Sequence, residues 1–278
     1  MQNPSPVTAI HAGQPASDGA GVRLTRIIGT QNLDMVDPFL MLDRFHSDQP
    51  GDYLAGFPDH PHRGFETVTY MVAGRMRHRD NKGHEGVIEA GGVQWMTAGG
   101  GIIHSEMPEQ SDGVLWGYQL WVNLPASDKM VDPRYAEFSA PQIPEEVRDA
   151  GASLKVVTGT TSLGTTGPVT GVATDPLYFD ITLAPSSSFV EPLPAGHSAM
   201  VVMVTGTASI GSNELGADDL AVLGEGDGLS VTAGSEGARL LLIAGRPLAE
   251  PVARYGPFVM NSQAELRQAV EDFQAGRF

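Results

Sequence analysis

Residues 60–74, HPHRGFETVTYMVAG, place two histidines just before an apolar, strand-like run that ends at a glycine. His60 and His62 are spaced i, i+2, and the segment His104-Ser105-Glu106 repeats that spacing 42 residues after His62. On a β-strand, residues two apart point to the same face and lie about 6.8 Å apart. Two such pairs on neighbouring strands would direct three imidazoles and one carboxylate at a single point. Three neutral nitrogens and one anionic oxygen suit a divalent metal such as Fe(II), Mn, Ni, Cu or Zn.

Each pair by itself could arise by chance, because the chain has eight histidines among 278 residues. Both pairs, however, lie in strand-like sequence rich in glycine. Their combination therefore predicts a metal site better than either pair does.

The composition indicates an all-β protein. The chain has 34 glycines and 20 prolines, with many short runs of Val, Ile, Thr, Tyr and Phe between them. The formal net charge of −16 repels phosphate groups, so we expect no direct nucleic-acid binding. The absence of cysteine excludes disulfides, thiolate metal ligands and cysteine nucleophiles.

The N-terminal stretch MQNPSPVTAIHAGQ has neither a basic segment nor an apolar one, so it does not read as a signal peptide. No apolar run approaches the length of a membrane span. We therefore expect a cytoplasmic protein that does not enter a membrane, and we expect it to be a monomer.

The chain divides at a stretch rich in proline, residues 125–144, where the strand pattern is interrupted. Both halves show the same succession of an apolar strand, a glycine turn at Gly74 or Gly206, and further strands. This predicts two similar β-barrels, residues 1–135 and residues 136–278. The strands are expected at 22–29, 65–72, 75–79, 86–89, 93–97, 114–123, 154–158, 177–183, 199–205, 207–210, 220–223 and 239–244.

One helix is predicted at the C-terminal end of the second domain. Ser262-Gln263-Ala264-Glu265 has the pattern of a capping box, and an amphipathic stretch follows it. The second half contains the single histidine His197 and lacks a counterpart of the two pairs. One imidazole cannot hold a transition metal tightly, so the second barrel is expected to carry no metal and His197 to be structural.

The motifs resemble those of the cupin superfamily, whose members are jelly-roll β-barrels. Residues 60–74 resemble the first cupin motif with one extra residue before the glycine, and TAGGGIIH, residues 97–104, resembles the second with a glycine run in place of P-x-G. More narrowly, HPHRGFETVTYM, VQWMTAGGGIIHSE, LWGYQLWVNLP, DPFLMLDRF and YGPFVMNSQAE resemble the pirin family across nearly the whole chain. The resemblance implies two cupin domains with a short C-terminal helix and one metal in the first domain.

The resemblance also implies the ligand set: His60, His62, His104 and Glu106, with iron as the usual metal. We expect Fe(II), with Mn, Ni, Cu, Co or Zn as alternatives. Glu66 occupies the position where many other cupins have their carboxylate ligand, but the family pattern favours Glu106. We therefore expect Glu66 to support the site without binding the metal, and Glu106 to act as a ligand and as a candidate base.

Other polar residues near the motifs are weaker candidates. His78 and His84 flank a hairpin turn and are expected to be solvated, while Gln94, Gln119 and Trp121 could line the barrel but are expected to serve packing or hydrogen bonding. The run Gly99-Gly100-Gly101 is expected to let the backbone pass close to the metal.

Four ligands around an octahedral metal would leave two open positions, enough for dioxygen and one substrate oxygen. With Glu106 as the one anionic ligand, the site would retain a charge of about +1 and favour an ionised phenol or enol. The pirin resemblance implies a quercetin 2,3-dioxygenase-like enzyme acting on a flavonol. The alternative is a regulator without catalytic activity that senses metal or redox state and acts through a protein partner.

Overall fold

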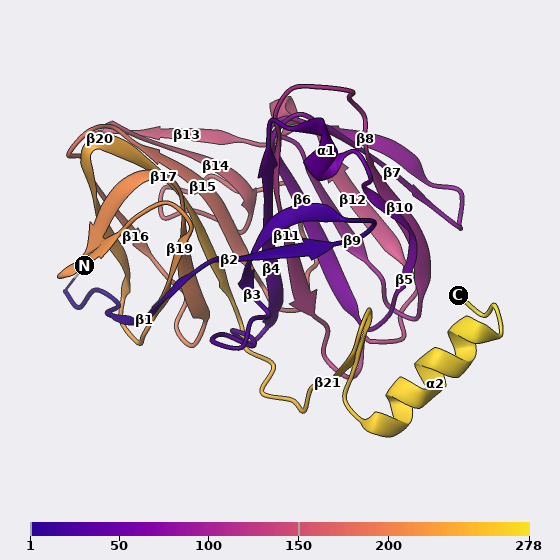
Figure 1. The fold of residues 1–278 in the computed structure, drawn as a ribbon. Helices are drawn as coiled ribbons and strands as arrows, with labels where there is room; N and C mark the ends of the chain where they lie inside the picture. The colour runs from indigo at the N-terminus through magenta and orange to yellow at the C-terminus, as the bar shows by residue number, and fades with distance from the viewer. Residues whose placement is uncertain (1, 150) are drawn as a thin grey trace. The chain divides into compact units, whose positions relative to one another are not determined.

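The computed structural model describes residues 2–149 and 151–278. The chain forms two compact units, and neither is continuous in sequence. The N-terminal unit consists of Gln14–Ala140 and Leu248–Phe278, and the C-terminal unit of Met1–Gly13 and Pro141–Pro247. Strands dominate both units (Figure 1), which confirms the all-β prediction.

The N-terminal unit contains two main sheets. One has the order β12-β9-β6-β11-β4-β3-β2 and the other the order β5-β10-β7-β8, while β21 and β22 form a separate pair. The elements of this unit are β2 (Gln14–Asp18), β3 (Val22–Ile28), β4 (Phe39–Ser47), α1 (Pro50–Tyr53), β5 (Phe57–His62), β6 (Phe65–Ala73), β7 (Arg75–Asp80), β8 (Glu85–Glu89), β9 (Val93–Thr97), β10 (Ile102–Pro108), β11 (Leu115–Asn123), β12 (Arg134–Phe138), β21 (Ala253–Tyr255), β22 (Phe258–Met260) and α2 (Gln263–Gln274).

The C-terminal unit contains one sheet of the order β1-β19-β17-β20-β15-β14-β13, with β16 paired to β20 and β18 to β17. Its strands are β1 (Val7–Ala12), β13 (Glu145–Arg148), β14 (Ala152–Thr158), β15 (Leu177–Leu183), β16 (Ser188–Pro192), β17 (Ser198–Ile210), β18 (Asn213–Leu215), β19 (Asp219–Leu223) and β20 (Gly228–Gly245). The short 3-10 helix η1 (Ala140–Gln142) lies in the chain where one unit gives way to the other.

Alternating apolar residues of the C-terminal unit form a continuous core. Leu154, Val156, Phe179 and Ile181 from two neighbouring strands are all fully buried members of it. This packing follows from the period of two along each strand, which sends every second side chain inward. The core of this unit is thus built from hydrocarbon side chains.

The predicted domain boundary lies close to the observed division between Ala140 and Pro141. The prediction for the two ends of the chain was wrong, because the first residues belong to the C-terminal unit and the last residues to the N-terminal unit. Strand β1 pairs with β19 in the C-terminal unit, with Val7 opposite Leu223. Helix α2, drawn in yellow in Figure 1, belongs to the N-terminal unit and packs on β21 and β22. Both placements depend on contacts between residues far apart in sequence, which for α2 include the ion pair of Asp272 with Arg63. Local patterns do not encode such contacts.

The start of α2 confirms the predicted capping box. The backbone N–H of Glu265 donates to Oγ of Ser262 at 3.3 Å, and the backbone N–H of Asn261 donates to the Glu265 carboxylate at 3.0 Å. The first bond satisfies a donor that the first helical turn leaves free, and the second holds the residue before the N-cap.

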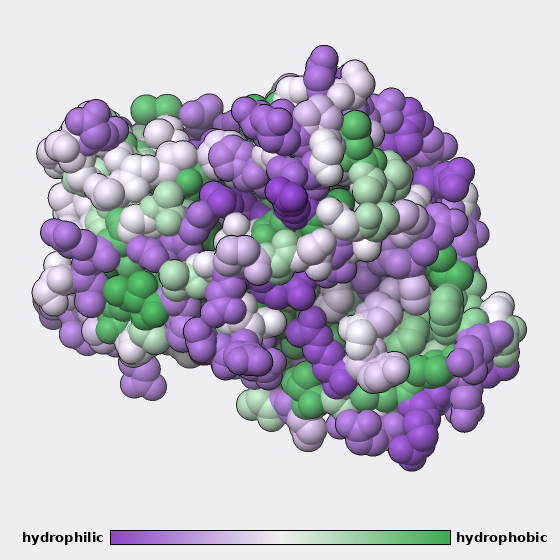
Figure 2. Space-filling view, in the orientation of Figure 1, coloured by the Kyte–Doolittle hydropathy of each residue, from purple (hydrophilic) through white to green (hydrophobic). Residues whose placement is uncertain are grey.

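Hydrophilic residues cover most of the face drawn in Figure 2, with hydrophobic residues in small groups between them. Among the described residues, no helix is long and apolar enough to cross a membrane.

Candidate metal centre

Strands β5 and β10 bring the three predicted histidine ligands together. They pair antiparallel, with His104 opposite His60 and Ile102 opposite His62. The ring centroids of His60 and His104 are 4.4 Å apart, and those of His62 and His104 are 5.0 Å apart. One ring nitrogen from each histidine lies within 4.8 Å of the other two, so the three could bind a single ion.

Burial keeps two of these imidazoles neutral. His62 and His104 are 3% and 1% exposed. Burial, together with the nearby His104 and His60, lowers the pKa of His62 well below its usual value. Burial also lowers the pKa of His104, to about 4. Because a metal binds the neutral imidazole, both rings are ready to act as ligands at neutral pH.

The nitrogens of these two rings fit a metal for a second reason. All four are buried and have no hydrogen-bond partner among the described residues. His60 differs, because its Nδ1 lies 2.8 Å from the carbonyl oxygen of Pro58, which assigns the N–H to Nδ1 and leaves the lone pair on Nε2. Buried ring nitrogens without partners are costly in a folded protein, and a bound metal would remove that cost for one nitrogen of each ring.

Glu106 is held close to the histidines as an ionised carboxylate. It is 2% exposed and accepts hydrogen bonds from Thr69 Oγ1 and Gln119 Nε2, both at 2.9 Å. Burial alone would raise the pKa of Glu106, but the nearby His104 and His60 and these two hydrogen bonds outweigh it and lower the pKa. Its carboxylate is not part of the group of three histidines described above, so its role as a ligand stays a prediction.

Glu66 lies in a different environment. It is 1% exposed, and its Oε1 accepts a hydrogen bond of 2.7 Å from Thr97, while its Oε2 is buried with no partner among the described residues. Burial raises the pKa of Glu66. Glu66 and Thr69 are three positions apart on β6, so their side chains point to opposite faces of the sheet. Since Thr69 contacts Glu106, Glu66 points away from that carboxylate.

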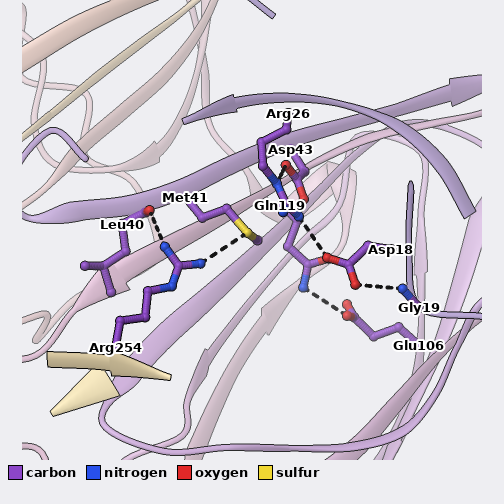
Figure 3. A network of polar contacts seen from close by, with 9 residues as sticks. All are labelled: Asp18, Gly19, Arg26, Leu40, Met41, Asp43, Glu106, Gln119 and Arg254. Atoms are coloured by element: carbon purple, nitrogen blue, oxygen red, sulfur yellow. Dashed lines mark hydrogen bonds and ion pairs between the residues drawn. The ribbon is translucent and has the colours of Figure 1, made fainter. Parts of the chain in front are cut away.

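A pocket of about 540 Å³ opens beside the histidines. His60, His62 and Glu106 line one part of it, and aromatic and charged side chains line the rest. Gln119 and Trp121 also belong to the pocket wall, while Gln119 additionally positions Glu106, as Figure 3 shows. The pocket therefore gives a small molecule access to the candidate ligands.

The prediction that His78 is solvated was wrong. His78 is 3% exposed, and its Nε2 lies 2.6 Å from the carboxylate of Glu137. It lies opposite Glu106 on the paired strand β10, so both side chains point to the same, buried face. His84 is exposed, as predicted, and contacts Asp80.

The glycine run packs closely against other segments of the chain, and its predicted role beside the metal stays a prediction. A Cβ atom at Gly99 would collide with the carbonyl oxygen of Val131, and one at Gly101 would lie 2.8 Å from the ring of Phe278. Both glycines have positive φ, +50° and +137°, which favours glycine for a further reason. The run makes room for other segments of the chain.

In the C-terminal unit, His197 Nε2 lies 2.9 Å from the carbonyl oxygen of Asp175. Among the described residues, the one group of histidines and acids close enough to share a metal is that of the N-terminal unit.

Arg63, which directly follows His62, was not among the residues predicted for the site. Its guanidinium is buried, donates to the carbonyl oxygen of Gly100 at 2.7 Å and to Asp272 at 2.7 Å, and lies 4.3 Å from the centre of the Phe278 ring. The one signal in the sequence for a role of Arg63 at the site was its position next to His62. Its partners Asp272 and Phe278 lie at the C-terminal end, and local sequence does not reveal them.

The fold and this site define a protein of the cupin class, with two cupin domains. Family models described as "Pirin" and "Pirin C-terminal cupin domain" match residues 21–122 and 178–278. A pirin-like protein of Caulobacter vibrioides is 56% identical over 273 residues, which cover 98% of this chain and 99% of that protein. Human pirin is 42% identical over 280 residues, covering 99% and 94%. The chain therefore belongs to the pirin family.

A solved structure shows the same fold. Quercetin 2,3-dioxygenase from Acinetobacter baumannii superimposes with a TM-score of 0.90 at 31% identity, and the match covers 99% of this chain and 98% of that one. This similarity confirms the predicted pair of cupin domains.

Proposed function

We propose that this chain is a metal-dependent dioxygenase that opens the ring of a flavonol-like, quercetin-type substrate with dioxygen. One observation carries the proposal: three histidines converge beside a pocket of about 540 Å³, and two of them present buried nitrogens without partners. A pocket of this volume is within the range that holds small ligands. The name of the similar Acinetobacter baumannii protein supports the substrate class.

His60, His62, His104 and Glu106 would hold one divalent metal in the N-terminal unit, and we propose Fe(II). The donor set of imidazoles and one carboxylate is the set that such a metal prefers. When bound, the metal would supply the redox chemistry that allows dioxygen to react with a phenolic or enolic ring.

The remaining steps belong to residues of the chain. The ionised carboxylate of Glu106, fixed by Thr69 and Gln119, is placed to accept the proton of a substrate hydroxyl in the pocket. The rings of Phe45, Phe57 and Trp121 line the same pocket and can pack against an aromatic substrate. Packing of this kind also excludes water from the reacting atoms.

An oxygen-uptake assay tests the proposal. Protein purified without oxygen and loaded with Fe(II) should consume dioxygen with quercetin and release carbon monoxide. The loss of the visible absorbance of quercetin should be proportional to the metal content. If the metal-loaded protein consumed no oxygen with quercetin or with related phenols, but bound one protein partner in only one redox state, the regulator alternative would replace the enzyme.

A further inference from the structure

Arg254 is a cation in the wall of the candidate substrate pocket whose direct contacts are all with uncharged groups. It lies on β21, is exposed, and lines the pocket together with His60 and His62. Its Nη1 donates to the carbonyl oxygen of Leu40 at 3.2 Å, and its Nη2 lies 3.9 Å from the sulfur of Met41 (Figure 3). Its guanidinium carbon is 5.1 Å from the centre of the Trp121 ring.

Arg26, the other arginine of this pocket, differs from Arg254 because carboxylates neutralise its charge. Arg26 donates two hydrogen bonds to the carboxylate of Asp43, at 2.9 and 2.7 Å, and a third to Asp18 at 2.8 Å (Figure 3). Two carboxylates therefore satisfy Arg26. Arg254 forms no ion pair with any residue in the described part of the chain. The like charge of Arg26 and the carboxylates of Asp34, Asp43 and Asp18 act on it at longer range.

Arg254 has unused capacity for an anion. A guanidinium carries five N–H donors in a fixed plane and stays charged at neutral pH. Two of the five are engaged by a carbonyl oxygen and a thioether, and a thioether is a weak acceptor. The free donors suit a carboxylate, which can accept two parallel hydrogen bonds from one guanidinium.

Trp121 connects this cation to the candidate metal centre. Its ring is 5.2 Å from the ring of His62, centre to centre, and Arg254 lies over the same ring system. The distance from the guanidinium carbon to the centre of the His62 ring is therefore at most the sum of 5.1 Å and 5.2 Å. Because Arg254, His60 and His62 line the same pocket, a single ligand in that pocket could reach both ends.

We propose that Arg254 binds a carboxylate of the substrate, so that the pocket prefers a phenol or enol carrying a carboxylate at the end remote from its metal-binding oxygens. This inference rests on the proposed function, because it takes the phenolic or enolic end of the ligand to lie at the histidines. It adds a specificity-determining residue and narrows the substrate class.

A purely structural role for Arg254, as a cover over Trp121, makes a different prediction. A cover would affect neutral and anionic ligands equally, whereas a carboxylate site affects the anionic ligand alone. Two catechols of nearly the same shape separate these roles: 3,4-dihydroxybenzoate carries the carboxylate, and 3,4-dihydroxybenzamide replaces it with a neutral amide.

The experiment measures the dissociation constants of both catechols by calorimetry, on protein loaded with zinc so that no turnover occurs. The wild type should bind the benzoate about 10- to 100-fold more tightly than the benzamide, the range for a hydrogen-bonded charge. Arg254→Met should leave the benzamide affinity unchanged and remove most of the preference for the benzoate. The preference that remains should be the one caused by the different acidity of the two catechols' hydroxyl groups, which bind the zinc. Arg254→Lys should keep part of the preference. Unchanged benzamide binding shows that the variant pocket is intact.

Arg267→Met is the matched control, because Arg267 is exposed on α2 and does not line the pocket. It should keep the wild-type preference. The proposal is overturned if the wild type does not distinguish the two catechols, or if Arg254→Met keeps the preference. A wild type that oxidises quercetin but shows no preference would refute this inference alone, whereas a zinc-loaded protein that binds neither catechol would also count against the proposed function.

Discussion

Arg63 and Asp272 form an ion pair of 2.7 Å although 209 residues separate them in the sequence. Arg63 directly follows the candidate ligand His62, and Asp272 lies on the C-terminal helix α2. The side chain of Arg63 is 4% exposed and that of Asp272 is 15% exposed, so water screens this pair little. The end of the chain is thereby attached to the loop that follows the candidate metal ligands.

Arg63→Met should therefore weaken metal binding, because the loop after His62 loses its attachment to α2. We expect a loss of up to about tenfold in metal affinity, the lower end of the effect of residues that support a ligand. A competition assay with a chelator of known affinity measures this change.

Arg277→Met is its control, since Arg277 pairs with the same carboxylate but is 54% exposed. Exposed ion pairs contribute little, so this variant should bind metal like the wild type. Equal metal affinity in all three proteins would show that the attachment of α2 does not support the site.

Acid should weaken the same attachment. Hydrogen bonds from Arg63, Arg277 and Gln268 lower the pKa of Asp272 from its usual value of 3.8. Since the folded pKa is below the unfolded one, the pair stabilises the fold above about pH 4 and progressively less as the pH falls below that value. The melting temperature of the metal-free wild type should therefore exceed that of Asp272→Asn at pH 6, and the difference should shrink toward pH 3. A difference that stays constant across this range would contradict the assignment.

His62→Ala and His104→Ala should each lower metal affinity by more than roughly 100-fold. This is the largest loss typical of residues that support a ligand without binding the metal. Both should keep the β-rich circular dichroism spectrum, because the N-terminal unit has an apolar core that includes Phe45, Met71 and Leu115. His84→Ala, which removes an exposed histidine outside the candidate site, should bind metal normally. Global unfolding of the first two variants would mean that the histidines are needed for the fold itself.

The two buried glutamates should differ in their effect on the metal. Glu106→Gln removes a charge beside the histidines and should lower metal affinity strongly. Glu66→Gln should lower it by at most about 10- to 100-fold, as expected for a residue outside the ligand shell. Isothermal titration with a divalent metal measures both. The reverse order would place Glu66, rather than Glu106, in the ligand shell.

Replacing Lys129 should lower the free energy of unfolding independently of the metal. Lys129 is 2% exposed, and its ammonium group donates to Gly64 O, Asn123 Oδ1 and Val259 O at 2.7, 2.7 and 3.0 Å. Lys129→Met would leave three buried acceptors without a donor, at a cost of about 3 kcal/mol or more. Urea unfolding measures the change, and Lys82→Met, at an exposed position, is the control. A cost below about 1 kcal/mol would show that the acceptors find other donors.

The sequence allowed the parts of the fold that depend on local patterns to be predicted. The spacing of His60, His62 and His104 placed three imidazoles on two strands, and the strands at 93–97 and 177–183 have the predicted bounds. The helix start at Ser262 followed from its capping box. Each of these signals lies within a few consecutive residues.

The remaining features depend on contacts between distant segments. Nothing near Asp272 in the sequence indicates that it pairs with Arg63, and nothing near Val7 indicates that it pairs with Leu223. His78 has the polar neighbours of a solvated residue, yet its strand pairs with β10 and buries it. Arg254 enters the pocket because β21 belongs to the N-terminal unit, which no local pattern in its own half of the chain predicts.

A titration of metal-free protein with Fe(II), followed by oxygen uptake in the presence of quercetin, tests whether one metal per chain carries the reaction. The rate should rise in proportion to added Fe(II), stop rising at one metal per chain, and stay at background in His104→Ala. Oxygen uptake by the metal-free protein, or a rate that His104→Ala leaves unchanged, would contradict this prediction.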